Sequence, residues 1–194
     1  MKVVTSSGDF LTVNSYKHSD LFWALRGGGG GTYGVVVSVT YRTYPSTAVT
    51  AIYIEANSTN TQTFTKFFTE FIRIHTNLSD LGFGGYLSIA PSPSNRMDAF
   101  YIAPNVTQEQ ANKTIDPFFA FAQNLTSEGL NITAAFTVPY PSWYAWYKLL
   151  YSTGQPQVGF ISEMASRLIS RDTFENNPQG IAEAVLALDG AGWT

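Results

Sequence analysis

The order of strands and helices in residues 49–138 constrains the fold of this chain more than any other feature. Segments rich in strand-forming residues are predicted at 51–55, 83–90, 97–103 and 131–138. Between the first two, aromatic residues recur at helical spacing on one face: Phe64, Phe67, Phe68, Phe71 and His75. The Pro-Ser-Pro-Ser-Asn segment at 91–95 predicts a turn between the second and third strands.

A capping box, Thr107-x-x-Gln110, predicts the start of a second helix, which Pro117 should kink or restart. The resulting order is strand, helix, two strands, helix, strand, which is typical of an antiparallel sheet covered by helices on one face. The sequence therefore predicts an α+β fold for this region. A helix starting at Pro141, a strand or loop near 158–164 and a helix at 179–188 follow.

The first 45 residues have a different pattern. Residues 1–13 predict a hairpin around Gly8, which must extend a larger sheet because a lone hairpin is not stable. Ser19 or Asp20 is expected to cap a short buried helix at 21–25. Five glycines then lead into 35–41, where the density of β-branched residues predicts a central strand. The change of character near Ser46 predicts two domains, 1–45 and 46–194.

Composition excludes several classes of protein. The net charge is −3 and the 11 Lys and Arg residues form no basic run, so a nucleic-acid partner is not expected. Every apolar run is too short for a membrane span. The absence of cysteine removes disulfides and thiolate metal sites, and only two histidines remain as imidazole ligands. No metal site is predicted.

Six Asn-x-Ser/Thr sequons, more than chance predicts, indicate a secreted glycoprotein. They begin at Asn57, Asn77, Asn105, Asn112, Asn124 and Asn131. The N-terminus nevertheless lacks the apolar h-region of a signal peptide. We therefore expect that further sequence precedes Met1.

The glycine run is the strongest candidate binding element. Gly29-x-Gly31-x-x-Gly34 formally matches the dinucleotide fingerprint, but here a helix precedes the glycines and a strand follows them, which is the reverse order. No Lys-Ser or Lys-Thr follows, so a phosphate-binding P-loop is also excluded. Successive glycines can bring several backbone N–H groups close to an anion or a flat ring. A flexible loop or a tight corner is the structural alternative.

The stretch from Asp20 to Thr40 is very similar to the signature that closes the FAD-binding domain of berberine-bridge-enzyme-like, or PCMH-type, FAD-linked oxidases. The hairpin before it also resembles the family, with Ser6-Ser7 where Ala-Asp is common, and residues 162–171 resemble a weaker family segment. The resemblance implies that 1–45 is the end of an FAD-binding domain. It implies that 46–194 is a substrate domain, truncated at its C-terminal end.

The same resemblance implies that the parent enzyme oxidises a small organic substrate by hydride transfer to FAD. The motif positions whose backbone lies near the cofactor are Gly29, Gly30, Gly31, Thr32, Gly34, Val35 and Val36. The family's pyrophosphate loop and its flavin-attaching histidine have no counterpart here. The chain alone is therefore not expected to hold FAD. Trp23 and Leu25 also match the motif, but an apolar helix turn favours a place in the core.

The catalytic base is not fixed by the resemblance, and Tyr86, Tyr101 and Glu163 are the candidates. His75 is expected to be a hydrogen-bonded core residue and His18 to be exposed. An aromatic cluster can either line a pocket for a flat or sugar-like substrate or pack as helical core: Tyr140, Trp143, Tyr144, Trp146 and Tyr147. The substrate, electron acceptor and oligomeric state stay open.

Two other functions are compatible with the sequence. The chain can be a glycosylated module that binds a carbohydrate or aromatic ligand through its Trp and Tyr residues, or a truncated product without function. The N-terminal hairpin argues against an independent module, because it needs partner strands.

Overall fold

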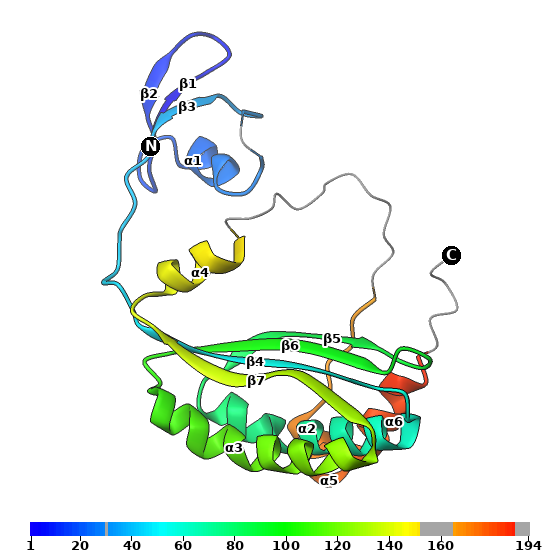
Figure 1. Ribbon diagram of the computed structural model, residues 1–194. Coiled ribbons are helices and arrows are strands. Elements are labelled where there is room, and N and C mark those ends of the chain that lie inside the picture. Colours follow the sequence, from blue (N-terminus) through cyan, green and yellow to red (C-terminus); the bar gives the residue numbers. More distant parts are fainter. Residues whose placement is uncertain (30, 152–164, 189–194) are drawn as a thin grey trace. The chain divides into compact units, whose positions relative to one another are not determined.

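The computed structural model describes residues 1–29, 31–151 and 165–188. The chain divides into two compact units, an N-terminal unit, Met1–Pro45, and a C-terminal unit, Ser46–Thr194. Figure 1 shows the elements of each unit. Both combine helices with antiparallel sheets, which confirms the α+β class.

The N-terminal unit contains a three-stranded sheet and one short helix: β1 (Lys2–Val4), β2 (Phe10–Thr12), α1 (Ser19–Leu25) and β3 (Val35–Ser38). The strand order is β2-β1-β3, so the predicted hairpin is confirmed and its third strand comes from later in the chain. Val3 and Val13 are fully buried. The prediction that 35–41 forms a central strand is wrong within the described residues, since β3 pairs only with β1.

The helix α1 also differs from expectation. None of its residues is buried, and Trp23 is 80% exposed. A unit of this size has too little chain to cover both sides of its elements. Neither Ser19 nor Asp20 caps the helix; His18 stands at the N-cap with φ 50° and makes no side-chain capping bond.

The C-terminal unit is built on a four-stranded antiparallel sheet in the order β5-β6-β4-β7. Its elements follow the predicted order: β4 (Val49–Ser58), α2 (Thr61–Asp80), β5 (Gly84–Ala90), β6 (Arg96–Pro104), α3 (Gln108–Asn124), the short 3-10 helix η1 (Leu125–Glu128) and β7 (Leu130–Tyr140). Three further helices are α4 (Trp143–Tyr151), α5 (Arg171–Asn176), which was not predicted, and α6 (Pro178–Leu186). The expected strand or loop at 158–164 lies outside the described residues.

The helices α2, α3, α5 and α6 cover one face of this sheet, whereas α4 lies on the other side (Figure 1). The aromatic residues predicted to share one face of α2 form the centre of the core, with Phe64, Phe67, Phe68 and Phe71 at most 1% exposed. Ile115 and Phe118 of α3 pack into the same core. We call the covered side the helix face and the other side the open face.

Local signals place the helix ends. The side chain of Asn60 accepts hydrogen bonds from the backbone N–H groups of Gln62 and Thr63, which begins α2. The capping box predicted at Thr107 and Gln110 is confirmed. Of the two outcomes predicted for Pro117, a kink or a restart, the restart does not occur, because α3 runs through Pro117 as one helix. Burial of the neighbouring Ile115 and Phe118 offsets the hydrogen bond that an interior proline removes.

One irregularity interrupts the pairing of β4 with β7. Glu55 pairs with Ala134, but the next residue, Ala56, pairs with Ile132, so Thr133 is an extra residue on β7. The Thr133 hydroxyl donates a hydrogen bond of 3.2 Å to the Glu55 carbonyl. This β-bulge keeps Ile132 in contact with the core.

Candidate functional site

Close backbone packing explains two glycines of the N-terminal unit. Gly34 has φ 150°, and a Cβ there would lie 2.8 Å from both the Val3 side chain and the Val4 carbonyl oxygen. A Cβ at Gly28 would lie 2.6 Å from the Tyr33 ring. Side chains at either position would push β3 or the glycine turn out of place. These glycines are therefore needed for local structure whether or not a ligand binds.

The predicted FAD contacts lie in this turn and on β3, apart from Gly30, which falls outside the described residues. Gly29 and Gly31 have φ values of 94° and 81°, which other residues rarely adopt. Val35 and Val36 are 65% and 38% exposed. Thr32 is also exposed. An exposed backbone of this kind is available to a ligand, and the assignment to FAD stays a prediction.

A pocket of about 540 Å³ lies beside the turn, lined by Trp23, Ala24, Arg26, Gly27, Gly28 and Tyr33. The Arg26 guanidinium lies 5.3 Å from the centre of the Phe22 ring. Trp23 was expected in the core, but it borders this pocket instead. One cation and two aromatic rings beside a glycine-rich backbone suit a flat, anionic ligand.

The open face of the C-terminal sheet carries a row of aromatic side chains, one from each strand. Tyr53 of β4 pairs with Phe136 of β7 on one side and with Phe100 of β6 on the other, and Phe100 pairs with Tyr86 of β5. The ring centres of Tyr53 and Phe136 are 5.3 Å apart, and those of Tyr86 and Phe100 are 5.6 Å apart. We call these four residues the aromatic row.

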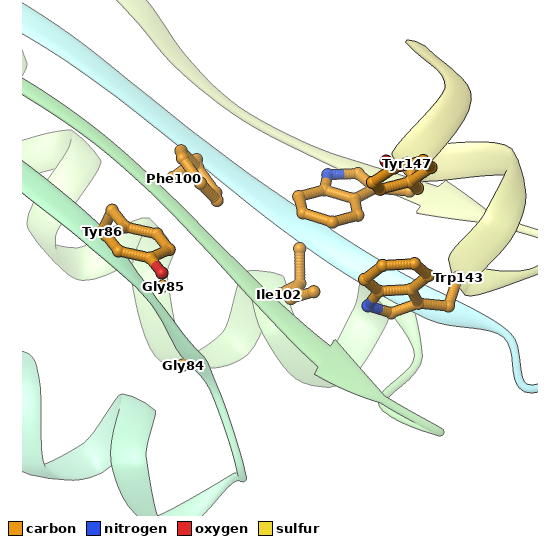
Figure 2. A pocket seen from close by; sticks show the side chains of 8 residues that line it. Gly84, Gly85, Tyr86, Phe100, Ile102, Trp143 and Tyr147 are labelled. Carbon is orange, nitrogen blue, oxygen red and sulfur yellow. The ribbon is translucent and has the colours of Figure 1, made fainter. Parts of the chain in front are cut away.

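An open pocket of about 470 Å³ lies between the helix α4 and the open face. Figure 2 shows Tyr86, Phe100 and Ile102 on the strands, with Trp143 and Tyr147 projecting from α4. The lining residues are Gly84, Gly85, Tyr86, Phe100, Ile102, Trp143, Trp146 and Tyr147. We call this the α4 pocket.

Tyr53 connects the row to α4. Its hydroxyl accepts a hydrogen bond of 3.0 Å from the Trp146 indole N–H and lies 3.2 Å from the Tyr140 hydroxyl. Burial, followed by the hydrogen bond to Tyr140, raises the pKa of Tyr53 above its ordinary value. The Tyr53 hydroxyl is therefore neutral at physiological pH, and it holds Trp146, which is 3% exposed.

Beyond the aromatic row, the open face becomes charged. The Arg96 guanidinium contacts the Glu55 carboxylate at 2.6 Å and the Asp98 carboxylate at 2.7 Å. The hydrogen bond with Asp98 raises the pKa of Arg96. A second pocket, of about 440 Å³, includes Glu55 and Asp98 and shares Tyr86 and Phe100 with the α4 pocket. Two adjoining pockets, of which only the second is lined by charged side chains, therefore meet at the aromatic row.

The candidate catalytic residues separate on this sheet. Tyr86 lies on the open face and is 73% exposed. Tyr101 lies on the helix face, is 5% exposed, and packs against Phe71 and His75. Burial raises the pKa of Tyr101 to about 12. Tyr101 therefore cannot contact a ligand on the open face, because the sheet lies between. Glu163 lies outside the described residues.

His75 is a half-buried core residue, as predicted, but the predicted hydrogen bond is not found at its buried Nδ1 atom. Its Nδ1 atom has no hydrogen-bond partner among the described residues. The ring stacks on Phe174 of α5 with centres 5.1 Å apart. Burial lowers the pKa of His75. His18 is exposed, as predicted.

The predicted aromatic cluster has mixed roles. Trp143, Trp146 and Tyr147 line the α4 pocket, and Tyr140 belongs to the hydrogen-bonded group around Tyr53. Tyr144 is 64% exposed, with the Lys148 ammonium 5.8 Å from its ring centre.

The sequon asparagines lie at the surface or partly below it. Asn77, Asn105, Asn124 and Asn131 are exposed. Asn57 and Asn112 are half-buried, and both accept hydrogen bonds, from Asn131 and Thr137 respectively.

Sequence reasoning missed Tyr53, Glu55 and Asp98 as residues of the open face. A signal was present, since Ile52 and Ile54 alternate with Tyr53 and Glu55 at the period of two expected for a strand with one buried face. Among the described residues, no group of three or more His, Cys, Asp or Glu side chains is placed to hold a metal ion. No helix of the described part is long and apolar enough to cross a membrane.

Comparison with known proteins agrees with the resemblance seen in the glycine segment. No family model matches the sequence. The chain is 34% identical over 197 residues to an uncharacterized FAD-linked oxidoreductase of Arthroderma benhamiae, covering 96% of this chain and 33% of that protein. It is 32% identical to the FAD-linked oxidoreductase patO of Aspergillus clavatus, covering 95% of this chain and 32% of the relative.

The fold has counterparts among solved structures. A VAO-type flavoprotein of Myceliophthora thermophila C1, MtVAO615, matches 98% of this chain and 34% of its own with a TM-score of 0.60 at 22% identity. A second, MtVAO713, matches 76% of this chain and 28% of its own with a TM-score of 0.52 at 25% identity. Over nearly its whole length the chain is thus similar to a part of proteins that are named FAD-linked oxidoreductases. It spans about a third of the length of the relatives it matches.

Proposed function

We propose that this chain is part of an FAD-dependent oxidoreductase of the berberine-bridge-enzyme-like type, which oxidises a small organic substrate by hydride transfer to the flavin. The observation that carries the proposal is the aromatic row on the open face, together with the α4 pocket beside it. Soluble proteins rarely leave a continuous apolar face uncovered unless it binds something. Because the relatives are named FAD-linked oxidoreductases, we assign flavin-dependent oxidation to that face.

In this proposal the N-terminal unit contacts the cofactor. The backbone of the glycine turn and β3 would hold it through Gly29, Gly30, Gly31, Thr32, Gly34, Val35 and Val36. The pocket with Arg26, Trp23 and Tyr33 fits an anionic and partly flat group, which supports the assignment. When bound, FAD supplies the acceptor for the hydride.

The C-terminal unit would bind and orient the substrate on its open face. Of the three catalytic candidates, Tyr86 is the described one whose side chain lies on that face. Its hydroxyl can accept or donate a proton beside the aromatic row. Glu55 and Asp98, held by Arg96, would bind a polar part of the substrate in the adjoining pocket.

We also propose that the protein carrying this chain is secreted and glycosylated. Six sequons support this, four of them with exposed asparagines. Mass spectrometry before and after enzymatic removal of N-glycans, on protein made in a fungal host, would test it. A mass unchanged by deglycosylation would contradict the proposal.

The function is tested by transplanting residues 1–194 into patO of Aspergillus clavatus in place of the matching third. We expect the purified chimaera to retain flavin, seen as visible flavin absorbance after gel filtration. Gly31→Val should reduce the flavin content. A Cβ at position 31 would meet no other atom within 4 Å, but valine disfavours the positive φ of this residue, so the backbone of the glycine turn would change its conformation. Ser88→Ala, on the open face, should not. A folded chimaera without flavin would overturn the proposal.

A further inference from the structure

We propose that the α4 pocket binds a planar, uncharged ring of the substrate and so selects aromatic or conjugated compounds over sugars and ions. The inference rests on the proposed function and names the substrate class for the same open face. The pocket lies wholly within the C-terminal unit, between strands β5 and β6 and helix α4 (Figure 2).

The lining of the pocket is aromatic on both walls. Five of its eight lining residues are aromatic, one is isoleucine and two are glycine. Aromatic side chains bind other rings through large contact areas and through offset or edge-to-face packing, with centres about 4.5–7 Å apart. A flat ring can meet such contacts from the strands and from the helix at once.

The aromatic groups on α4 are held in a fixed arrangement. Trp143 stacks on Tyr147 with ring centres 5.2 Å apart and an angle of 16° between the planes. Trp146 lies 5.6 Å from Trp143 and 5.8 Å from Phe100. The hydrogen bond from Trp146 to Tyr53 fixes this group against the sheet. A wall set in advance lowers the entropy lost when a ring binds.

The lack of charged side chains in the lining of the pocket favours an uncharged ligand. No lining residue has a charged side chain, so an ion entering the pocket would lose hydration without gaining a partner there. A sugar can stack on an aromatic ring, but its hydroxyls need many donors and acceptors. The lining contains no amide or carboxylate side chain, and its side-chain hydrogen-bonding groups are the Tyr86 and Tyr147 hydroxyls and the indole N–H groups of Trp143 and Trp146, the last of which is engaged by Tyr53.

Gly84 supplies space for the ring. It lines the pocket, and a Cβ placed on it would meet no other atom within 4 Å. Its φ is not in the left-handed region, so the backbone does not require glycine. Neither steric crowding nor backbone conformation explains this glycine, whereas a ligand in the pocket does.

The test measures binding of three probes to the chain of residues 1–194, without FAD, by isothermal titration calorimetry. The probes are 2-naphthol, which is planar and uncharged at pH 7, its charged analogue 2-naphthoate, and maltose. We expect 2-naphthol to bind at least tenfold more tightly than the other two. Gly84→Leu should weaken 2-naphthol binding by about tenfold or more, since small changes in an apolar pocket have effects of this size.

Ser88→Leu is the matched control. It adds the same side chain to the same strand and face, at a residue that lines the second pocket and not the α4 pocket. We expect it to leave 2-naphthol binding within about twofold of the unsubstituted chain. Circular dichroism of both variants confirms that the fold is kept.

Three results would overturn the inference: no binding of 2-naphthol, equal or tighter binding of maltose or 2-naphthoate, or equal weakening by Gly84→Leu and Ser88→Leu. These results would leave the proposed function standing if the chimaera retains flavin. Conversely, selective binding of 2-naphthol by the chain, with a chimaera that lacks flavin, would support the pocket and overturn the FAD assignment.

Discussion

The two faces of the four-stranded sheet are made by the same strands but have opposite surroundings. On the helix face, Ile52, Ile54 and Tyr101 are at most 5% exposed beneath the helices. On the open face, the alternate positions hold Phe136 and Tyr86, which are 48% and 73% exposed. The helix face carries the large core, whereas the open face has a smaller buried cluster of Val49, Ala51 and Trp146 and leaves other apolar side chains exposed. The comparison indicates that apolar residues on the helix face provide stability and that those on the open face are available for binding.

The largest expected effect is a difference in the free energy of unfolding between substitutions on the two faces. Phe71→Ala on the helix side should lower the free energy of unfolding by about 3–5 kcal/mol, because it leaves a cavity among fully buried rings. Phe136→Ala, on the open face, should cost only about 1 kcal/mol, mostly through its contact with Tyr53. Urea denaturation followed by circular dichroism measures both. Equal losses would contradict the division between the faces.

A smaller effect is expected at the contact between the open face and α4. Tyr53→Phe removes the acceptor for the Trp146 N–H and should cost about 1 kcal/mol. Tryptophan fluorescence should shift to longer wavelength as α4 is held less firmly. Tyr86→Phe, in the same row but far more exposed, is the control and should change neither quantity. Unchanged fluorescence and stability in Tyr53→Phe would show that another contact holds the helix.

The smallest expected effect concerns pH and the helix face. Burial lowers the pKa of His75 below its ordinary value of about 6.5, so the folded state favours the neutral ring. Its contribution to stability is present above that value and is lost as the pH falls toward the folded-state pKa. We expect His75→Phe, which keeps the stack on Phe174, to lose less melting temperature between pH 7 and pH 5 than the unsubstituted chain.

His18→Asn is the control for this measurement, because His18 is exposed on the N-terminal unit and asparagine tolerates its positive φ. It should keep the full pH dependence. If His75→Phe loses as much melting temperature as the unsubstituted chain, the ring of His75 does not contribute to acid sensitivity.

The fold of the C-terminal unit was predictable because its signals are local. The spacing of phenylalanines in α2, the capping box at Thr107 and the turn at 91–95 each depend on neighbouring residues. The position of β3 at a sheet edge depends on which strands pair with it, which no local pattern specifies. The prediction that α1 is buried was wrong for the same reason, because the exposure of a helix depends on which other elements pack against it.

The candidate site was harder to predict than the fold. Tyr86 and Tyr101 are both strand tyrosines, yet they lie on opposite faces. In β6 the charged Arg96 and Asp98 alternate with Met97 and belong to the same set as Phe100, so this alternation already indicates that Tyr101 faces the helices. What the sequence does not specify is the register between strands, which places Phe100 beside Tyr86.

The bulge in β7 has a consequence for how related chains can differ in length. In a regular strand, removing one residue turns every side chain beyond it to the opposite face. Thr133 is already the extra residue, so a chain lacking it would pair Ile132 with Ala56 in regular register and keep every side chain on its present face. Within β7, Thr133 is therefore the position where evolution can delete a residue and keep both the core and the open face.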